Sequence, residues 1–380
     1  MHILVLGYIV RGPLGGMAWH HLQYVIGLKN MGHQVLFLED SDGYASCYNP
    51  LTYEVTIDPS YGLQFCKHLF TQHNLQYNWS YYDEHSNSWF GLSKKAVESF
   101  CKKADVVLNL SGINRIREWW SKIPARFYID TDPAFTQVKH LTNNAALESA
   151  KAHTHFATYG EHFGKAICAV PNDGFDWKPT RQPVVLSKWK VSQPTQNRHW
   201  TTVMQWDSYK SQEYKGKVYG MKSASFDAYL DLPSKVQDMF ELALGSHGAP
   251  KQKLEEAGWK ITDPLAVTLT TETYQQFIYN SKGEWSVAKQ GYVATNSGWF
   301  SERSAVYMSS GRPVIVQDTG FSHFLETGKG LFAFSSLGEA IESINRANTD
   351  YYFHCKQARL VAEEYFAAGK VLQTLLNYIE

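Results

Sequence analysis

Short apolar runs alternate along the chain with amphipathic segments, and turn-forming residues separate them. Residues 2–8 (HILVLGY) are apolar almost throughout, as in a parallel strand buried on both faces. Residues 17–31 carry apolar side chains at three- and four-residue steps, which predicts a helix with one core face. Residues 33–39 (HQVLFLE) form the next apolar run. The first forty residues therefore predict a strand–helix–strand unit.

The same alternation continues through both halves of the chain. In the first half we expect helices near residues 61–71 and 93–103, and strands at 76–82, 105–110, 126–129 and 154–158. In the second half we expect strands at 200–206, 239–244, 277–280, 313–316 and 331–334. Strands that alternate with helices in this way predict an α/β protein with doubly wound parallel sheets.

A change in composition separates the two halves. Residues 171–199 contain four prolines among mixed polar residues, which is typical of a linker. We therefore predict a Rossmann-like first domain at residues 1–175, a linker at 176–199 and a Rossmann-like second domain at 200–355. The chain after residue 336 is predicted to be helical.

The stretch 298–316 joins a glycine-containing loop to a short helix, a stop at Gly311 and a buried strand. Ser301 is a favoured N-cap residue, and Glu302 stands in the first turn. The free N–H groups and the positive dipole end of such a helix form a site for a phosphate or diphosphate. Glu302 either accepts hydrogen bonds from the hydroxyls of a sugar or ribose, or only complements the helix dipole.

Two aspartates follow the strand predicted at residues 126–129. Asp130 and Asp132 stand at its carboxyl end, where α/β proteins bind their ligands, so either is a candidate general base. The alternative for Asp132 is a helix N-cap before Pro133. His20, one turn into the first helix, is a third candidate base, with a buried structural histidine as its alternative.

Composition excludes several classes of function. The 380 residues include 36 basic and 36 acidic side chains, and a net charge of zero argues against general nucleic-acid binding. The five scattered cysteines lack a C-x-x-C pair, and no histidine spacing suggests a metal site, so we expect no metal and no cofactor. No apolar run is long enough to span a membrane and no signal-peptide pattern is present, which predicts a cytoplasmic protein.

Several of these motifs resemble those of a known family. Glu302, followed by residues 311–314 (GRPV) and preceded by residues 279–285 (YNSKGEW), resembles the donor-site signature of glycosyltransferases with the GT-B fold, in particular families 1 and 4. The turn at residues 11–16 resembles the one that opens their acceptor domain and faces the donor phosphates. Its alternative is a tight turn that needs positive φ. The resemblance implies two domains facing a central cleft, and a last helix, at residues 356–380, that packs back on the first domain.

The resemblance also implies which residues hold the donor. Glu302 would bind the nucleotide ribose, and the helix start and the glycine turn would bind the phosphates. Lys282 is the preferred cation, because it follows the apolar run 277–279 in a loop beside the donor motif. The expected nucleotide-sugar-binding residues are Gly15, Gly16, Lys282, Gly298, Trp299, Phe300, Ser301, Glu302 and Arg303.

We therefore predict a metal-independent glycosyltransferase that moves a hexose from a nucleotide diphosphate sugar to a small-molecule or lipid-like acceptor. Many retaining enzymes of this fold carry a second glutamate eight residues before the ribose glutamate. That position is Ala294 here, so an inverting mechanism with an aspartate base is preferred. A nucleotide-sugar epimerase, a protein- or DNA-modifying transferase and a non-catalytic sugar-binding protein remain alternatives.

Overall fold

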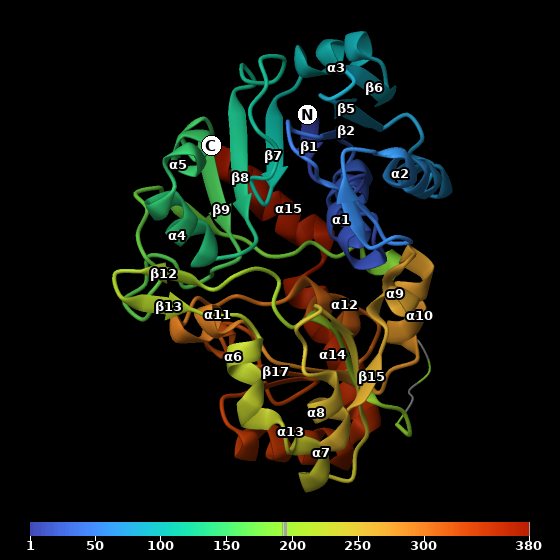
Figure 1. The fold of residues 1–380 in the computed structure, drawn as a ribbon, viewed down its shortest axis with the longest axis vertical. Helices are drawn as coiled ribbons and strands as arrows, with labels where there is room; N and C mark the ends of the chain where they lie inside the picture. Colours follow the sequence, from blue (N-terminus) through green and yellow to red (C-terminus); the bar gives the residue numbers. More distant parts are fainter. Residues whose placement is uncertain (192, 194–195, 380) are drawn as a thin grey trace.

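The computed structural model describes residues 1–191, 193 and 196–379, which form two α/β domains, one above the other in Figure 1. The sheet of the first domain has the strand order β10-β9-β8-β7-β1-β2-β5-β6, and that of the second domain has the order β15-β14-β11-β16-β17-β18. Every neighbouring pair in these sheets is parallel except β5 and β6. The predicted α/β class with two doubly wound domains is confirmed.

In the first domain, β1 is central and its apolar residues are buried on both faces. The strands are β1 (His2–Leu6), β2 (Gln34–Asp40), β5 (Trp79–Asp83), β6 (Ser88–Gly91), β7 (Val106–Leu110), β8 (Ala125–Asp130), β9 (His155–Thr158) and β10 (Trp177–Pro179). A hairpin follows β2 and consists of β3 (Cys47–Asn49) and β4 (Glu54–Thr56). The helices are α1 (Gly15–Asn30), α2 (Ser60–Gln72), α3 (Lys94–Cys101), α4 (Phe135–Thr142) and α5 (Asn144–Lys151).

The second domain continues the same strand–helix alternation. Its strands are β11 (Trp200–Gln205), β12 (Gln212–Tyr214), β13 (Lys217–Tyr219), β14 (Phe240–Gly245), β15 (Lys260–Thr262), β16 (Gly283–Ser286), β17 (Val314–Gln317) and β18 (Leu331–Phe334). Its helices are α6 (Ser223–Phe226), α7 (Leu232–Lys235), α8 (Lys251–Glu256), α9 (Pro264–Thr268), α10 (Thr271–Tyr279), α11 (Gln290–Ala294), α12 (Glu302–Ser309), α13 (Leu337–Thr349), α14 (Tyr351–Tyr365) and α15 (Ala368–Leu376). Short 3-10 turns occupy Leu186–Lys188, Asp227–Tyr229, Phe321–His323 and Asn377–Ile379.

One predicted strand is wrong. Residues 277–280 lie at the end of α10, and the strand of this region, β16, begins only at Gly283. Of the apolar residues 277–279, Ile278 lies on the buried face of the helix and its two neighbours are half-buried. The strand itself contains Glu284, which is buried although it is charged, so the hydrophobic pattern does not indicate a strand there.

Two predicted boundaries also differ from the structure. The segment 176–199 contains β10, which joins the edge of the first sheet beside β9; residues 192, 194 and 195 of this segment lie outside the described part of the chain. The boundary at residues 355–356 falls inside α14. The final helix, α15, packs against α1 of the first domain, where the methyl of Ala368 and a methyl of Leu372 approach Gly27 (Figure 1).

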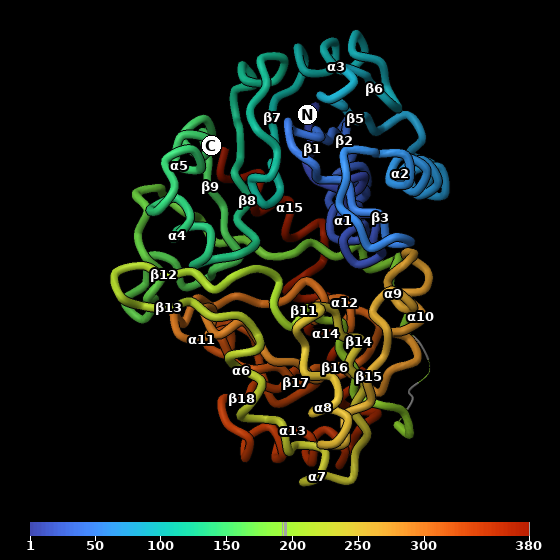
Figure 2. Tube along the Cα trace, in the orientation of Figure 1, coloured from blue at the N-terminus to red at the C-terminus, as the bar shows by residue number. Residues whose placement is uncertain are grey.

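The start of α12 lies between the two domains. Figure 2 shows α12 on the side of the second sheet that faces the first domain, and the helix packs on β16 and β17. Apolar side chains of α1, α10 and α12 belong to one continuous core, so the two domains share buried surface. No helix within the described ranges is long and apolar enough to cross a membrane.

Candidate active site

The amino end of α12 forms an anion-binding geometry at the carboxyl edge of the second sheet. Ser301 caps the helix, as expected, and its hydroxyl accepts the N–H of Arg303 at 3.2 Å. The N–H groups of Glu302 and Ser304 and the Ser304 hydroxyl have no partner among the described residues. A hollow adjoins them, lined by Ser286, Val287, Ala288, Trp299, Phe300, Ser301, Arg303, Ser304, Val316, Gln317, Thr319 and Phe321.

Arg303 is fixed at one side of this hollow. Its Nε donates to the buried carboxylate of Glu284 at 2.5 Å. Its two terminal nitrogens donate to the Val203 carbonyl at 2.7 Å and to the Ser286 hydroxyl at 2.9 Å. These contacts span the ends of β11 and β16, so the guanidinium holds one position and supplies a positive charge beside the α12 start.

Lys222 supplies a second cation that the sequence analysis did not identify. It immediately precedes α6, the residue is half-buried, and its ammonium makes no hydrogen bond or ion pair within the described ranges. Burial lowers the pKa of Lys222 well below its usual value, and the nearby Arg303 charge lowers it further, while Glu284 and Glu302 oppose the shift. No motif marks this lysine, because the fold brings it beside α12 from eighty residues earlier in the chain.

Glu302 faces the first domain across the gap between the two sheets. Its charge acts on Tyr8, which follows β1, and on His20 of α1. Burial, followed by the charge of Glu302, raises the pKa of Tyr8 to about 12. The carboxylate in the first turn of α12 therefore lies opposite the opening turn of the first domain.

The backbone N–H groups between β1 and the turn at residues 11–16 already bind an anion. The N–H groups of Ile9, Val10 and Arg11 all donate to the carboxylate of Glu39 at 2.7 Å. This internal anion satisfies the backbone donors that a phosphate would otherwise use. Burial nevertheless raises the pKa of Glu39, against the effect of Arg11 and the three N–H donors.

Gly15 and Gly16 lie where α1 of the first domain packs against α10 of the second. A Cβ on Gly15 would lie 2.1 Å from the carbonyl oxygen of Thr270, at the start of α10. One on Gly16 would lie 3.4 Å from the ring of Tyr274. Neither glycine has positive φ, so the alternative reading of a positive-φ turn is wrong. Both glycines therefore contact the start of α10 in the second domain.

Lys282 lies at the opposite edge of the second sheet from the α12 start. Because β16 begins at Gly283, Lys282 precedes the strand instead of following one. Its ammonium pairs with Asp238, and it lies 5.4 Å from the centre of the Trp200 ring. Its assignment to the donor site was a consequence of the misplaced strand and is wrong.

The two predicted aspartates have different surroundings. Asp130 is wholly buried and accepts hydrogen bonds from the Asp132 N–H and from the side chains of Thr136, Gln137 and Thr158. Burial raises the pKa of Asp130, while these donors oppose the shift. Asp130 therefore fixes the loop before α4 and is closed to an acceptor.

Asp132 reaches across to the second domain. Its carboxylate lies 2.9 Å from the ammonium of Lys289 and accepts the hydroxyls of Tyr209 and Tyr292. The N-cap alternative is wrong, since the residue before α4 is Ala134. Asp132 accepts the N–H of Thr136 through its backbone carbonyl and not through its side chain. The carboxylate is 29% exposed, so it borders the gap between the domains.

His20 and the loop before α12 complete the predicted set. His20 is buried, its Nδ1 has no partner among the described residues, and burial lowers its pKa. Gly298 has φ of +75°, which favours glycine. Trp299 stacks on Tyr292 at 4.4 Å and donates its indole N–H to the Thr131 carbonyl at 3.2 Å. Phe300 packs between Phe321 and Phe366.

We searched the described residues for side chains that could bind a metal ion. Within the part of the chain that the structure describes, no group of three or more histidine, cysteine, aspartate and glutamate side chains is placed to hold a metal ion. The positive charges beside the α12 start come from Arg303 and Lys222.

Comparison with known proteins identifies solved structures with the same fold. No family model matches the sequence, and no curated protein matches it. Among solved structures, an alpha-glucosyltransferase in complex with UDP and mismatched DNA is 10% identical, with a TM-score of 0.57 over 99% of this chain and 98% of that one. Alr3699/HepE of Anabaena, in complex with UDP and glucose, is 13% identical, with a TM-score of 0.52 over 100% and 99%.

The chain has the GT-B fold. A third match, to AviGT4, a glycosyltransferase involved in avilamycin A biosynthesis, has a TM-score of 0.54 at 11% identity and covers 99% of this chain and 96% of that one. At these identities the likeness establishes the GT-B architecture over the whole chain. The chemistry of this GT-B protein rests on the residues described above.

Proposed function

We propose that this protein is a glycosyltransferase that binds a nucleotide diphosphate hexose at the start of α12 and transfers the hexose to an acceptor held by the first domain. One observation carries the proposal: the free N–H groups of Glu302 and Ser304 and the side chain of Arg303 meet at the carboxyl edge of the second sheet, with Lys222 close enough for its charge to interact with Arg303. In an α/β sheet this edge is where ligands bind.

The arrangement suits a diphosphate leaving group. As the bond between the hexose C1 and the diphosphate oxygen breaks, negative charge collects on that oxygen. Oriented N–H groups and fixed cations stabilise such charge without further reorganisation. Glu302 lies beside these donors and would accept hydrogen bonds from the ribose or hexose hydroxyls. Two structurally similar proteins, an alpha-glucosyltransferase and HepE, were solved in complex with UDP, so UDP-hexoses are the first donors to test.

Asp132 is the proposed general base. Lys289 and two tyrosine hydroxyls hold its carboxylate in one orientation, and the side chain is partly open to the gap between the domains. An acceptor hydroxyl would give its proton to Asp132 while its oxygen attacks C1 and the nucleoside diphosphate leaves with the bonding electrons. Such in-line attack inverts the configuration at C1.

Incubation of the purified full chain with a panel of nucleotide diphosphate sugars tests the proposal. Release of the nucleoside diphosphate, by transfer or by slow hydrolysis, is the expected result. Interconversion of the sugar on an intact nucleotide would identify an epimerase, and tight binding without turnover would identify a sugar-nucleotide-binding protein. Either result would overturn the transferase assignment.

A further inference from the structure

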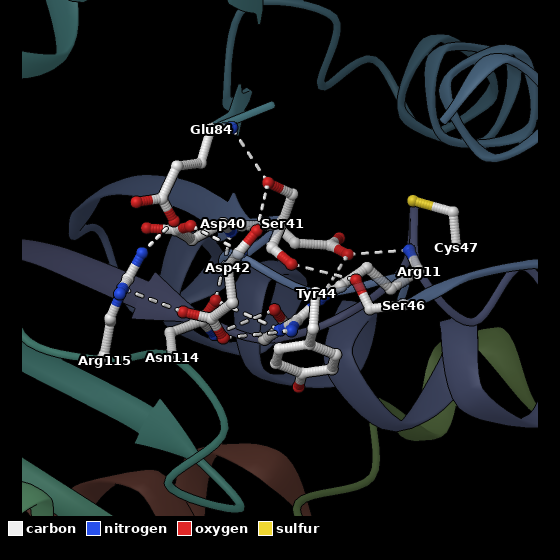
Figure 3. Close-up of polar contacts among 12 residues, drawn as sticks. Arg11, Asp40, Ser41, Asp42, Tyr44, Ser46, Cys47, Glu84, Asn114 and Arg115 are labelled. Atoms are coloured by element: carbon white, nitrogen blue, oxygen red, sulfur yellow. Dashed lines mark hydrogen bonds and ion pairs between the residues drawn. The ribbon is translucent and has the colours of Figure 1, made fainter. Parts of the chain in front are cut away.

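A network of seven charged side chains lies at the carboxyl edge of the first sheet, apart from the donor site. The loops after β1, β2, β5 and β7 contribute to it, and Figure 3 shows much of it. Its members are Arg11, Glu39, Asp40, Asp42, Glu84, Arg115 and Arg117. Four acids face three arginines, so the network carries a net charge of −1 by count.

The inner part of the network is structural. Glu39 is fully buried and receives the three backbone N–H groups of the opening turn as well as Arg11 Nε at 3.4 Å. Arg11 is buried too, and its guanidinium continues outward to Asp42 at 3.5 Å and to the side-chain oxygen of Asn114 at 3.3 Å. These contacts fix the loop conformations on which the outer part rests.

The outer part is open. Arg115 pairs with Asp42 at 3.1 Å and with Glu84, and its side chain is 45% exposed. Arg117 pairs with Asp40 at 2.5 Å and with Glu84 at 2.9 Å. Arg115 and Glu84 are the members of this part that solvent reaches, whereas Asp40 and Asp42 are mostly buried behind them. The guanidinium of Arg115 and the carboxylate of Glu84 retain N–H groups and lone pairs for a ligand.

A small surface depression adjoins this outer part. Asp40, Arg115, Tyr82 and Trp119 line it, and the buried indole N–H of Trp119 has no partner in the described part of the chain. The Arg117 guanidinium lies 5.2 Å from the centre of the Tyr82 ring and 5.8 Å from that of Trp119. The site thus combines alternating charges, an unused donor and aromatic rings.

Building on the glycosyltransferase function proposed above, we propose that this outer network binds the acceptor and that the acceptor is a neutral, hydroxyl-rich carbohydrate. A carboxylate accepts a hydrogen bond from one sugar hydroxyl while the guanidinium beside it donates to the next hydroxyl, and aromatic rings pack on the C–H face of a sugar ring. The excess of acids disfavours phosphorylated or acidic acceptors. Tyr8 lies close enough to Glu302 and to Arg11, in the inner part of the network, for both charges to act on it.

Saturation-transfer NMR on the full chain, without donor, tests the acceptor class directly. The probes are methyl glycosides of glucose, galactose and mannose, set against glucose 6-phosphate and glucuronic acid. Saturation of at least one neutral glycoside, with little or none of the two anions, is the expected result. Preferential binding of either anion, or binding of no probe, would overturn the proposal.

Two variants locate the binding. Arg115→Met and Glu84→Gln should each lower the affinity for the bound glycoside about tenfold, while the affinity for UDP and the unfolding temperature stay unchanged. Lys102→Met, an exposed lysine just after α3, is the matched control and should change nothing. Glycoside binding that survives both variants would contradict the assignment. UDP titration of the same proteins is independent, so a failed donor site is distinguished from a failed acceptor site.

Discussion

At the scale of single residues, the candidate lysines of the proposed donor site differ in whether an acidic side chain already pairs with them. Lys282 is neutralised by Asp238 and Lys289 by Asp132, whereas Lys222 makes no ion pair in the described structure. Sequence patterns mark a lysine as cationic but do not reveal its partner, which comes from a distant part of the chain. The preferred lysine was therefore wrong, and the one the structure favours carried no signal.

Replacing Lys222 tests its role as a diphosphate ligand. Lys222→Met should weaken UDP binding by about 1.5–3 kcal/mol, the usual range for a hydrogen bond to a charged group. The measurement is calorimetric titration with UDP. Lys210→Met, an exposed lysine between β11 and β12, is the control. Equal affinities of the Lys222 variant and the control protein would remove Lys222 from the site.

The same residue predicts a pH dependence. Because the pKa of Lys222 is lowered well below 10.5, its ammonium form is lost at a lower pH than that of an ordinary lysine. UDP affinity of the wild type should therefore be greatest at low pH and should fall as pH rises through the lowered pKa. Lys222→Met should flatten this decline over a series from about pH 6 to pH 9. An identical slope in both proteins would contradict the assignment.

At the scale of elements, the sequence was informative where one pattern dominated. Continuous apolar runs located β1, β7 and β17, and Ser301 with Gly311 marked the ends of α12. The pattern failed at β16, because its buried Glu284 is neutralised by Arg303, nineteen residues later. A buried ion pair between distant residues leaves no periodic signal, so the strand and the loop before it were both misplaced.

The start of α1 gives an element-scale prediction. Gly15→Ala would force a methyl group to 2.1 Å from the Thr270 carbonyl, so it should destabilise the protein by about 1–3 kcal/mol through displacement of α10. Gly16→Ala meets only ordinary contacts at 3.4 Å and should leave the stability unchanged or slightly raised. The urea midpoint of each variant is the measurement.

These paired glycine variants also separate two roles. If both glycines bound the donor phosphates, each substitution would lower UDP affinity to a similar extent. Packing against α10 predicts that only Gly15→Ala has a marked effect on stability. A Gly16→Ala variant that unfolds as easily as Gly15→Ala would contradict the packing account.

At the scale of the whole molecule, the two sheets present their carboxyl edges to a shared gap. Glu302 acts from one side on Tyr8 and His20, and Asp132 reaches from the other side to Lys289. The two-domain GT-B architecture was predictable, because repeated strand–helix units and the Glu302 motif both indicate it. The contacts between the domains were not, since they join residues that no local pattern relates.

Asp132 gives the prediction at this scale. If it is the general base, Asp132→Asn should lower kcat at least about a hundredfold, because general base catalysis contributes about 10²–10⁴-fold. Its UDP affinity should stay within about twofold of wild type, because Asn keeps the shape of the side chain and one acceptor oxygen for Lys289. Kinetics with the donor found in the panel, together with UDP titration, separate the two effects. Full turnover would assign the proton transfer to another group.

The most direct test of the proposed donor site at the start of α12 is the affinity of the Glu302→Ala variant for UDP. The account predicts a loss of about 1.5–3 kcal/mol, roughly tenfold to more than a hundredfold. Glu339→Ala removes a glutamate from the same first-turn position of α13 and should bind UDP like the wild type. An unchanged UDP affinity in Glu302→Ala would contradict the central claim.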